Sequence, residues 1–179
     1  RLQRMGLNSA RQYRPHASAR TGPPKDVEHL IDATIIDTDL GQCMVITEEF
    51  PADYVHGPHP LGHWLDHSSE IITSLTADSS QSSLPVNEVV FLDTETTGLG
   101  SGVGVLVFEI GIGYFTDEGS FEIKQFFLKD PMHEPALLAL LSEHLDQAAA
   151  LVTFNGRSFD VPMIADRYIM NRQRTRITS

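Results

Sequence analysis

The pattern of apolar positions is clearest in the second half of the chain, where it predicts a sheet with helices packed on it. A continuous apolar run that ends in acid, over residues 88–93, is typical of a buried strand. Two more strands are predicted at 105–115 and 121–128, joined by the turn sequence Asp117-Glu118-Gly119. A shorter strand is predicted at 151–154, after a helix.

Capping residues and leucine spacing predict two helices. Asp130 followed by proline is a typical helix start, and a leucine stripe over 137–145 supplies an apolar face. A second helix is expected from residue 158 or 159 to Met170, with Pro162 tolerated in its first turn. The element order β-β-β-α-β-α predicts an α/β fold, a mixed sheet flanked by helices.

The first half of the chain is less regular. Two strands are predicted at 33–36 and 42–48, a proline-containing loop at 50–60, and a helix at 61–75. A Ser-rich stretch then reads as a linker. The expected parts are a flexible basic lead-in at 1–26, a small N-terminal α+β extension at 27–76, the linker at 77–85 and the main domain at 86–179.

Length and composition fit one folded domain with an appendage. Of the 179 residues, 41% are apolar and 21% charged, which is enough to bury a core. The apolar runs are too short for a membrane span, and residues 1–25 lack the apolar segment of a signal peptide. The single cysteine, Cys43, excludes a disulfide within the chain and suits a reducing compartment. We therefore expect a cytoplasmic protein with no membrane association.

Charge is distributed unevenly, and it limits the class of partner. Only Lys124, Lys129 and Arg157 accompany all 24 acidic residues, which lie between Asp26 and Asp166. Such an acidic domain does not bind polyanions through a broad basic face. The two ends of the chain are basic and can contact phosphates, although Arg-rich ends are more often simply disordered.

The sharpest chemical feature is the sequence Phe-Leu-Asp-Thr-Glu-Thr-Thr-Gly at 91–98. Asp93 and Glu95 lie two residues apart at the end of a strand and so point to the same side of the backbone. Two carboxylates this close stay ionised when cations lie between them, and hard oxygen ligands suit Mg²⁺ or Mn²⁺. Taken alone, the pair is more readily explained as capping a turn before the glycine-rich loop.

A second strand-turn-helix segment carries Asn155 and Asp160. Asp160 lies in the first turn of the expected helix, where the helix dipole favours a carboxylate. If strand 151–154 lies beside strand 89–93, Asp160 can approach Asp93 and Glu95. The alternatives are plain helix stabilisation by Asp160 and a turn role for Asn155.

Together the two segments resemble the DEDD 3′-5′ exonucleases of the ribonuclease H-like superfamily. Asp93 and Glu95 match the first motif, and Asn155 and Asp160 match the second. The stretch Glu-Ile-Gly at 109–111 is also similar to that group. A closer resemblance is to the YprB-like ribonuclease H-like proteins of bacteria, on FLDTETTGLG, IGIGYF, QFFLKDP, EPALL and LVTFNGRSFDVP.

This resemblance implies a metal-dependent 3′-5′ exonuclease that hydrolyses phosphodiester bonds by in-line attack of water. Asp93, Glu95 and Asp160 are the implied catalytic residues and would hold two divalent cations, Mg²⁺ or Mn²⁺, about 4 Å apart. The implied partner is nucleic acid, RNA or DNA, with single-stranded 3′ ends. The implied substrate-binding residues are Thr96, Thr97, Gly98, Asn155 and Arg157.

One element of the family pattern is missing. The family carries a third motif with a fourth carboxylate, often with a His or Tyr nearby, and no such motif follows Asp160. Asp166 lies on the same expected helix but more than one turn away, so it is not assigned this role. The resemblance therefore predicts a nuclease domain truncated before its third motif.

Other functions remain open at this point. A hydrophobic strand ending in Asp-x-Glu is close to the haloacid-dehalogenase-type phosphatase motif, in which Asp93 would be the nucleophile. A non-catalytic nucleic-acid or protein binding module is the other alternative. The glycines at 98–104 do not fit a dinucleotide fingerprint. The closely spaced His56, His59, His63 and His67 fit a His-rich loop better than a metal site, and His144 is expected to be exposed.

Overall fold

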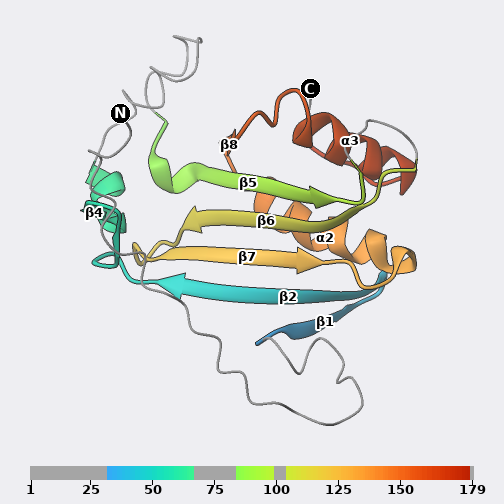
Figure 1. Ribbon diagram of the computed structural model, residues 1–179, viewed down its shortest axis with the longest axis horizontal. Coiled ribbons are helices and arrows are strands. Elements are labelled where there is room, and N and C mark those ends of the chain that lie inside the picture. The colour runs from blue at the N-terminus through green and yellow to red at the C-terminus, as the bar shows by residue number, and fades with distance from the viewer. Residues whose placement is uncertain (1–31, 67–83, 99–103, 178–179) are drawn as a thin grey trace, which may run out of the picture.

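The computed structural model describes residues 32–66, 84–98 and 104–177. Six of the strands in these ranges form one mixed sheet in the order β1-β2-β7-β6-β5-β8, and β3 and β4 form a separate two-stranded ladder (Figure 1). The expected lead-in at 1–26, most of the linker at 77–85 and the loop at 99–103 lie outside the described residues. The strands are β1 Thr34–Thr38, β2 Gly41–Phe50, β3 Val55–His56, β4 His59–Pro60, β5 Val89–Thr96, β6 Val107–Phe115, β7 Phe121–Phe127 and β8 Ala150–Thr153.

The helices lie where the capping signals predict them. Helix α2, Glu134–Leu145, connects β7 to β8, and α3, Asp160–Met170, follows β8. Asp130 caps the 3₁₀ turn Pro131–His133 that leads into α2, because its carboxylate accepts a hydrogen bond of 2.9 Å from the Met132 amide. Pro162 falls in the first turn of α3, where its missing N–H costs nothing. The predicted α/β class, a mixed sheet flanked by helices, is confirmed.

The N-terminal hairpin continues the sheet of the main domain. Strand β1 pairs antiparallel with β2, and β2 pairs antiparallel with β7 from Met44↔Phe127 to Phe50↔Phe121. Both predicted strands are present, and both extend beyond their predicted ends. The expected division of the chain at residues 77–85 stays a prediction, but the hairpin before it shares one sheet with the strands after it.

Strands β5 and β8 are parallel neighbours, in register from Val89↔Ala150 to Leu92↔Thr153. Strands β5, β6 and β7 are joined antiparallel. The carboxyl ends of β5 and β8 therefore meet at one end of the sheet, which satisfies the condition under which Asp160 can approach β5.

The two helices pack on one side of the sheet, here called the covered face (Figure 1). Alternate residues of each strand point to this side and meet the apolar stripe of α2 and the inner side of α3. The opposite side, which carries Phe91, Asp93 and Glu95 of β5, is called the open face. The fully enclosed side chains of the covered face include Ile110, Ile112, Phe126, Leu137, Leu138, Leu141, Ile164 and Tyr168.

Polar contacts also join α2 to α3. The Tyr168 hydroxyl donates to the carbonyl of Leu138 at 2.8 Å. The Arg167 guanidinium donates two hydrogen bonds of 2.5 Å to the buried carboxylate of Glu134. Asn171 donates a third to the same group at 2.7 Å. Removing either partner of the ion pair leaves an uncompensated buried charge, so the pair holds the two helices in one arrangement.

Cys43 of β2 lies in the core of the covered face and is 1% exposed. Burial raises the pKa of its thiol to about 12. The thiol therefore stays protonated and unreactive in the folded protein.

Two expectations for residues 50–75 need correction. The predicted loop at 50–60 contains the short ladder of β3 and β4. In place of an α-helix, a 3₁₀ helix spans Leu61–Asp66, and residues 67–75 lie outside the described ranges. The amides of Leu61 and Gly62 donate to the carbonyls of Tyr54 and Ala52 at 2.9 and 2.7 Å, which fixes the start of this helix to the preceding loop.

Candidate functional site

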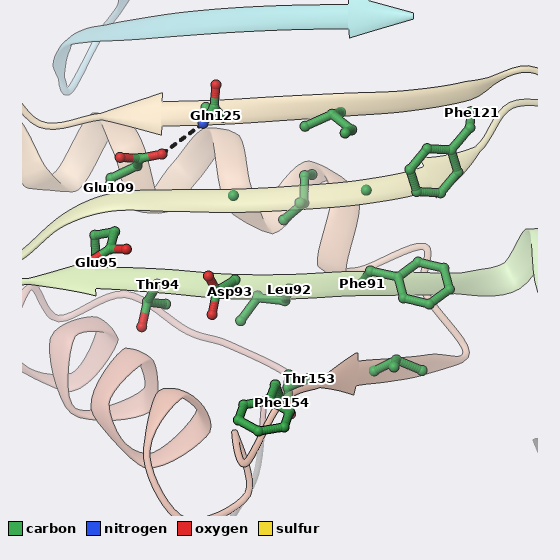
Figure 2. A pocket seen from close by; sticks show the side chains of 15 residues that line it. Phe91, Leu92, Asp93, Thr94, Glu95, Glu109, Phe121, Gln125, Thr153 and Phe154 are labelled. Atoms are coloured by element: carbon green, nitrogen blue, oxygen red, sulfur yellow. Dashed lines mark hydrogen bonds between the residues drawn. The ribbon is translucent and has the colours of Figure 1, made fainter. Parts of the chain in front are cut away.

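Asp93 and Glu95 project from the open face of β5 near its carboxyl end (Figure 2). Both side chains are exposed, whereas the preceding Leu92 points to the covered face and is buried. The alternation of β5 produces this arrangement, because residues two apart in a strand share a face. Across the antiparallel pairing, Asp93 lies opposite Gly111 and Glu95 lies opposite Glu109.

Asp160 approaches β5 from the covered face. Its carboxylate is 4% exposed and accepts a hydrogen bond of 2.5 Å from the Thr94 hydroxyl. Thr94 lies between Asp93 and Glu95 in the strand and points to the opposite side from both. The structure thus brings Asp160 to the same strand as Asp93 and Glu95, but to its other side.

The turn between β8 and α3 is tightly constrained. A Cβ atom at Gly156 would lie 2.2 Å from Thr153 Oγ1, so only glycine fits there. Thr153 Oγ1 accepts the Gly156 amide at 3.0 Å. Asn155 adopts a φ of 59°, in the left-handed region that asparagine tolerates. Asn155 and Arg157 are both exposed, so the turn presents them to solvent beside the end of β5.

Thr96, Thr97 and Gly98 brace the start of the loop that follows β5. The Thr96 hydroxyl donates to the carbonyl of Gly98 at 2.9 Å. Thr97 pairs with Leu106, since its amide donates to the Leu106 carbonyl and its hydroxyl accepts from the Leu106 amide, both at 3.0 Å. Thr97 therefore joins the two sides of the loop, and the Thr96 hydroxyl bonds only within its first side.

An open groove of about 950 Å³ lies on the open face, and Asp93, Glu95 and Glu109 line part of it (Figure 2). The rest is largely apolar, with Phe91 and Phe121 in edge-to-face contact at 5.9 Å between ring centroids. Phe154, which lines the same groove, is 92% exposed. The carboxylates thus lie beside an apolar surface large enough to contact a nucleotide-sized ligand.

Glu109 of β6 belongs to this face, and its sequence context assigned it no role beyond its place in the Glu-Ile-Gly stretch at 109–111. Its carboxylate accepts a hydrogen bond of 2.9 Å from the Gln125 amide. Burial, and next the negative charges of Glu95 and Asp93, raise the pKa of Glu109 above its ordinary value. The sequence signal was present, since Glu109 is the one charged residue of a nine-residue strand that is otherwise apolar or glycine apart from Tyr114.

The donor chemistry of this face fits a divalent cation, although the side chains do not yet converge on one point. In the described ranges, no three His, Cys, Asp or Glu side chains are placed to hold one metal ion. Asp93, Glu95 and Glu109 nevertheless share one face, and their carboxylate oxygens are the ligands that Mg²⁺ and Mn²⁺ prefer. The hydrogen bond from Thr94 holds the Asp160 carboxylate on the other side of β5, away from these three carboxylates.

The histidines are placed differently from one another. His56 and His59 lie opposite each other in the small ladder, and the rings of His59 and His63 stack at 5.1 Å. His67 lies outside the described residues. The expectation that His144 is exposed is wrong: its ring is partly buried between α2 and the sheet, 5.1 Å from the ring of Tyr114. Burial, followed by the charge of Lys124, lowers its pKa to about 4.

Residues 90–178 match the model of the RNase_H superfamily, and this part of the chain belongs to that superfamily. The chain is similar to YprB over most, not all, of its length. It is 31% identical over 137 residues to the uncharacterized protein YprB of Bacillus subtilis (strain 168), a match that covers 74% of this chain. The match covers 32% of YprB, so the chain spans about a third of the length of that relative.

None of the helices in the described ranges has the length and apolar character needed to cross a membrane.

Proposed function

We propose that this protein is a metal-dependent nuclease that hydrolyses phosphodiester bonds of single-stranded RNA or DNA, removing nucleotides from the 3′ end. The observation that carries the proposal is the exposed Asp93–Glu95 pair at the carboxyl end of β5, beside the groove on the open face. Superfamily membership supports nuclease-like hydrolysis of nucleic acid, and divalent metals are common in that superfamily. The match gives no support to the phosphatase alternative.

Asp93 and Glu95 are the residues proposed to hold the cations. Bound Mg²⁺ or Mn²⁺ supplies positive charge at the scissile phosphate and lowers the pKa of a bound water. The two carboxylates would hold the cations on the open face. The apolar part of the groove would accept nucleobases, whose faces stack on aromatic rings such as Phe91 and Phe154. The acidic surface opposes non-specific binding of duplexes, which favours a substrate held near the metal.

Asp160 is retained as a proposed third ligand, with Asn155 and Arg157 as proposed substrate contacts. For Asp160 to join Asp93, its carboxylate must leave the Thr94 hydroxyl. Arg157 is exposed in the turn after β8 and is a candidate for a phosphate contact. Thr96, Thr97 and Gly98 are kept as proposed substrate contacts at the start of the loop after β5, which Thr97 joins to Leu106.

The test is cleavage of 5′-labelled single-stranded RNA and DNA by the purified protein with Mn²⁺ or Mg²⁺. A ladder of shortening products indicates removal from the 3′ end, and chelation by EDTA stops the reaction. Asp93→Asn is expected to lower the rate at least about 1,000-fold with the fold intact. Asp117→Asn, in the exposed turn between β6 and β7, is the matched control and retains the rate.

Two results would contradict the proposal. One is cleavage by Asp93→Asn at the wild-type rate. The other is tight binding of the oligonucleotide by the wild type with no metal-dependent cleavage, which instead supports a non-catalytic binding module.

A further inference from the structure

The Asp160 carboxylate lies beside β5, but on the opposite face from Asp93 and Glu95. It is 4% exposed and accepts the hydrogen bond of 2.5 Å from the hydroxyl of Thr94, which Figure 2 shows between those two residues on the strand. A hydrogen bond to a buried carboxylate is among the stronger ones in a protein, because the charge is costly to leave without a donor. The Thr94 hydroxyl therefore favours this position of the carboxylate over any position in which the bond is broken.

The backbone around Asp160 is tied to the sheet, which leaves the side chain as the part that moves. Strand β8 is in register with β5 up to the pair Leu92↔Thr153. The Thr153 hydroxyl accepts the Gly156 amide at 3.0 Å, and the Gly156 carbonyl accepts the amide of Val161, in the first turn of α3, at 2.8 Å. We therefore expect the Asp160 carboxylate to move by rotation about its side-chain bonds, without a shift of α3.

The pairing of β8 with β5 stops just before Asp93. The last pair is Leu92↔Thr153, whereas β5 continues to Thr96. In the described ranges, residues 93–96 of β5 therefore have a strand neighbour only on the β6 side. This free edge leaves a route from the covered face, where Asp160 is held, to the open face, where Asp93 lines the groove.

We propose that Thr94 is the positioning residue of Asp160. In the held position, its hydroxyl keeps the carboxylate on the covered face; in the released position, the carboxylate has passed the free edge of β5 and lies beside Asp93. This inference rests on the proposed function, because it concerns how Asp160 joins the proposed site. A hydrogen bond to a charged group favours the held position by about 10- to 100-fold. Valine has nearly the shape of threonine but no donor, so Thr94→Val shifts the carboxylate towards the released position.

The experiment measures how fast a water-soluble carbodiimide and an amine label the carboxyl group of Asp160 in the full chain, read by mass spectrometry of its peptides. Thr94→Val is expected to raise this rate at least about tenfold, whereas Thr94→Ser, which keeps the hydroxyl, stays within about twofold of the wild type. The exposed Asp53 is the internal reference. Thr116→Val is the matched control, because it removes a partly buried hydroxyl that bonds to Ser120 at 2.8 Å, and it leaves the labelling of Asp160 unchanged.

Cleavage of a single-stranded oligonucleotide by the same proteins is the second readout. Thr94→Val is expected to raise the rate at least about threefold, because fewer molecules must break the bond before Asp160 reaches the site. Circular dichroism checks that each variant is folded. If valine prevents folding, Thr94→Ala replaces it, since alanine also lacks the donor and is smaller than threonine.

The outcomes separate this inference from the proposed function. Labelling of Asp160 at the wild-type rate in folded Thr94→Val refutes the role of Thr94, and the proposed function stands if the wild type cleaves. Equally fast labelling in Thr94→Ser and Thr94→Val assigns the effect to packing and also refutes it, as does faster labelling with slower cleavage. If the labelling follows the expected pattern but the wild type does not cleave, the proposed function fails and the control of Asp160 by Thr94 stands.

Discussion

The covered and open faces belong to the same strands, yet they are built from different residues. On β6, Ile110 and Ile112 point to the covered face and are almost fully enclosed by α2 and α3. Glu109 and Gly111 alternate with them and point to the open face. One face therefore has side chains chosen for packing, and the other has charges and empty space that packing does not require. The nine residues of β6 therefore contribute both to the hydrophobic core and to the candidate site.

The largest expected contrast comes from truncating the same side chain on each face. Ile110→Ala on the covered face is expected to lower the free energy of unfolding by about 2 to 5 kcal/mol, because a fully enclosed side chain leaves a cavity. Ile123→Ala on the open face of β7 is expected to cost less than about 1.5 kcal/mol, because its side chain is only partly buried. Urea unfolding of both variants measures the difference. Equal losses would mean that the open face is as closely packed as the covered face.

A smaller effect is expected from pH on the covered face. The pKa of His144 is lowered to about 4, so the unfolded chain binds this proton more tightly than the folded protein. The folded protein therefore has its full stability, as far as His144 determines it, above pH 6.5. The free energy of unfolding then decreases as the pH falls from 6.5 to 4, because the unfolded chain takes up the proton first. Since the ring is partly exposed and screened, we expect a loss of about 1 kcal/mol. Tyr114, Glu122 and Lys124 lie around the ring, and none of them is substituted in the variant that tests this prediction.

The measurement for this prediction is the urea midpoint at several pH values between 7 and 4. His144→Gln should flatten the part of the pH dependence that this ring contributes. An unchanged slope in the variant would assign the acid sensitivity to other groups.

The smallest expected effect is at Gly111, where a methyl group has room. Gly111→Ala is expected to stabilise the protein by about 0.5 kcal/mol, because glycine within a strand loses more backbone entropy on folding than alanine. Gly113→Ala, two residues along the same face, should destabilise it, because the new Cβ atom would lie 2.7 Å from the ring of Phe121. Thermal unfolding distinguishes the two signs, and destabilisation by both variants would show that the open face has no free space at Gly111.

The sequence predicted the strands and helices of the main domain because their signals are local. The apolar run before Asp93, the cap at Asp130 and the leucine stripe of α2 each act within one element. Element order predicted a mixed sheet, but the parallel pairing of β5 with β8 was only a condition for bringing Asp160 near Asp93, and the structure meets that condition. The ladder of β3 and β4 was missed because each of its strands has two residues, which is too short to show strand periodicity.

The candidate site could be predicted only in part. Strand alternation placed Asp93 and Glu95 on one face. The side from which α3 reaches β5 depends on the tight turn at Gly156, and sequence spacing could not show that Asp160 meets Thr94. Glu109 required knowledge of the register, because a single charge in an apolar strand gains meaning only when its partner across the ladder is known.

The buried thiol of Cys43 can report how often the sheet opens. Because the only thiol of the chain is enclosed in the core beneath α2, a thiol-specific reagent reaches it only when β2 separates from its neighbours. The rate of labelling therefore reports how often this sheet opens, without the need to introduce a cysteine. That rate measures whether the hairpin of β1 and β2 detaches by itself or only together with the rest of the sheet.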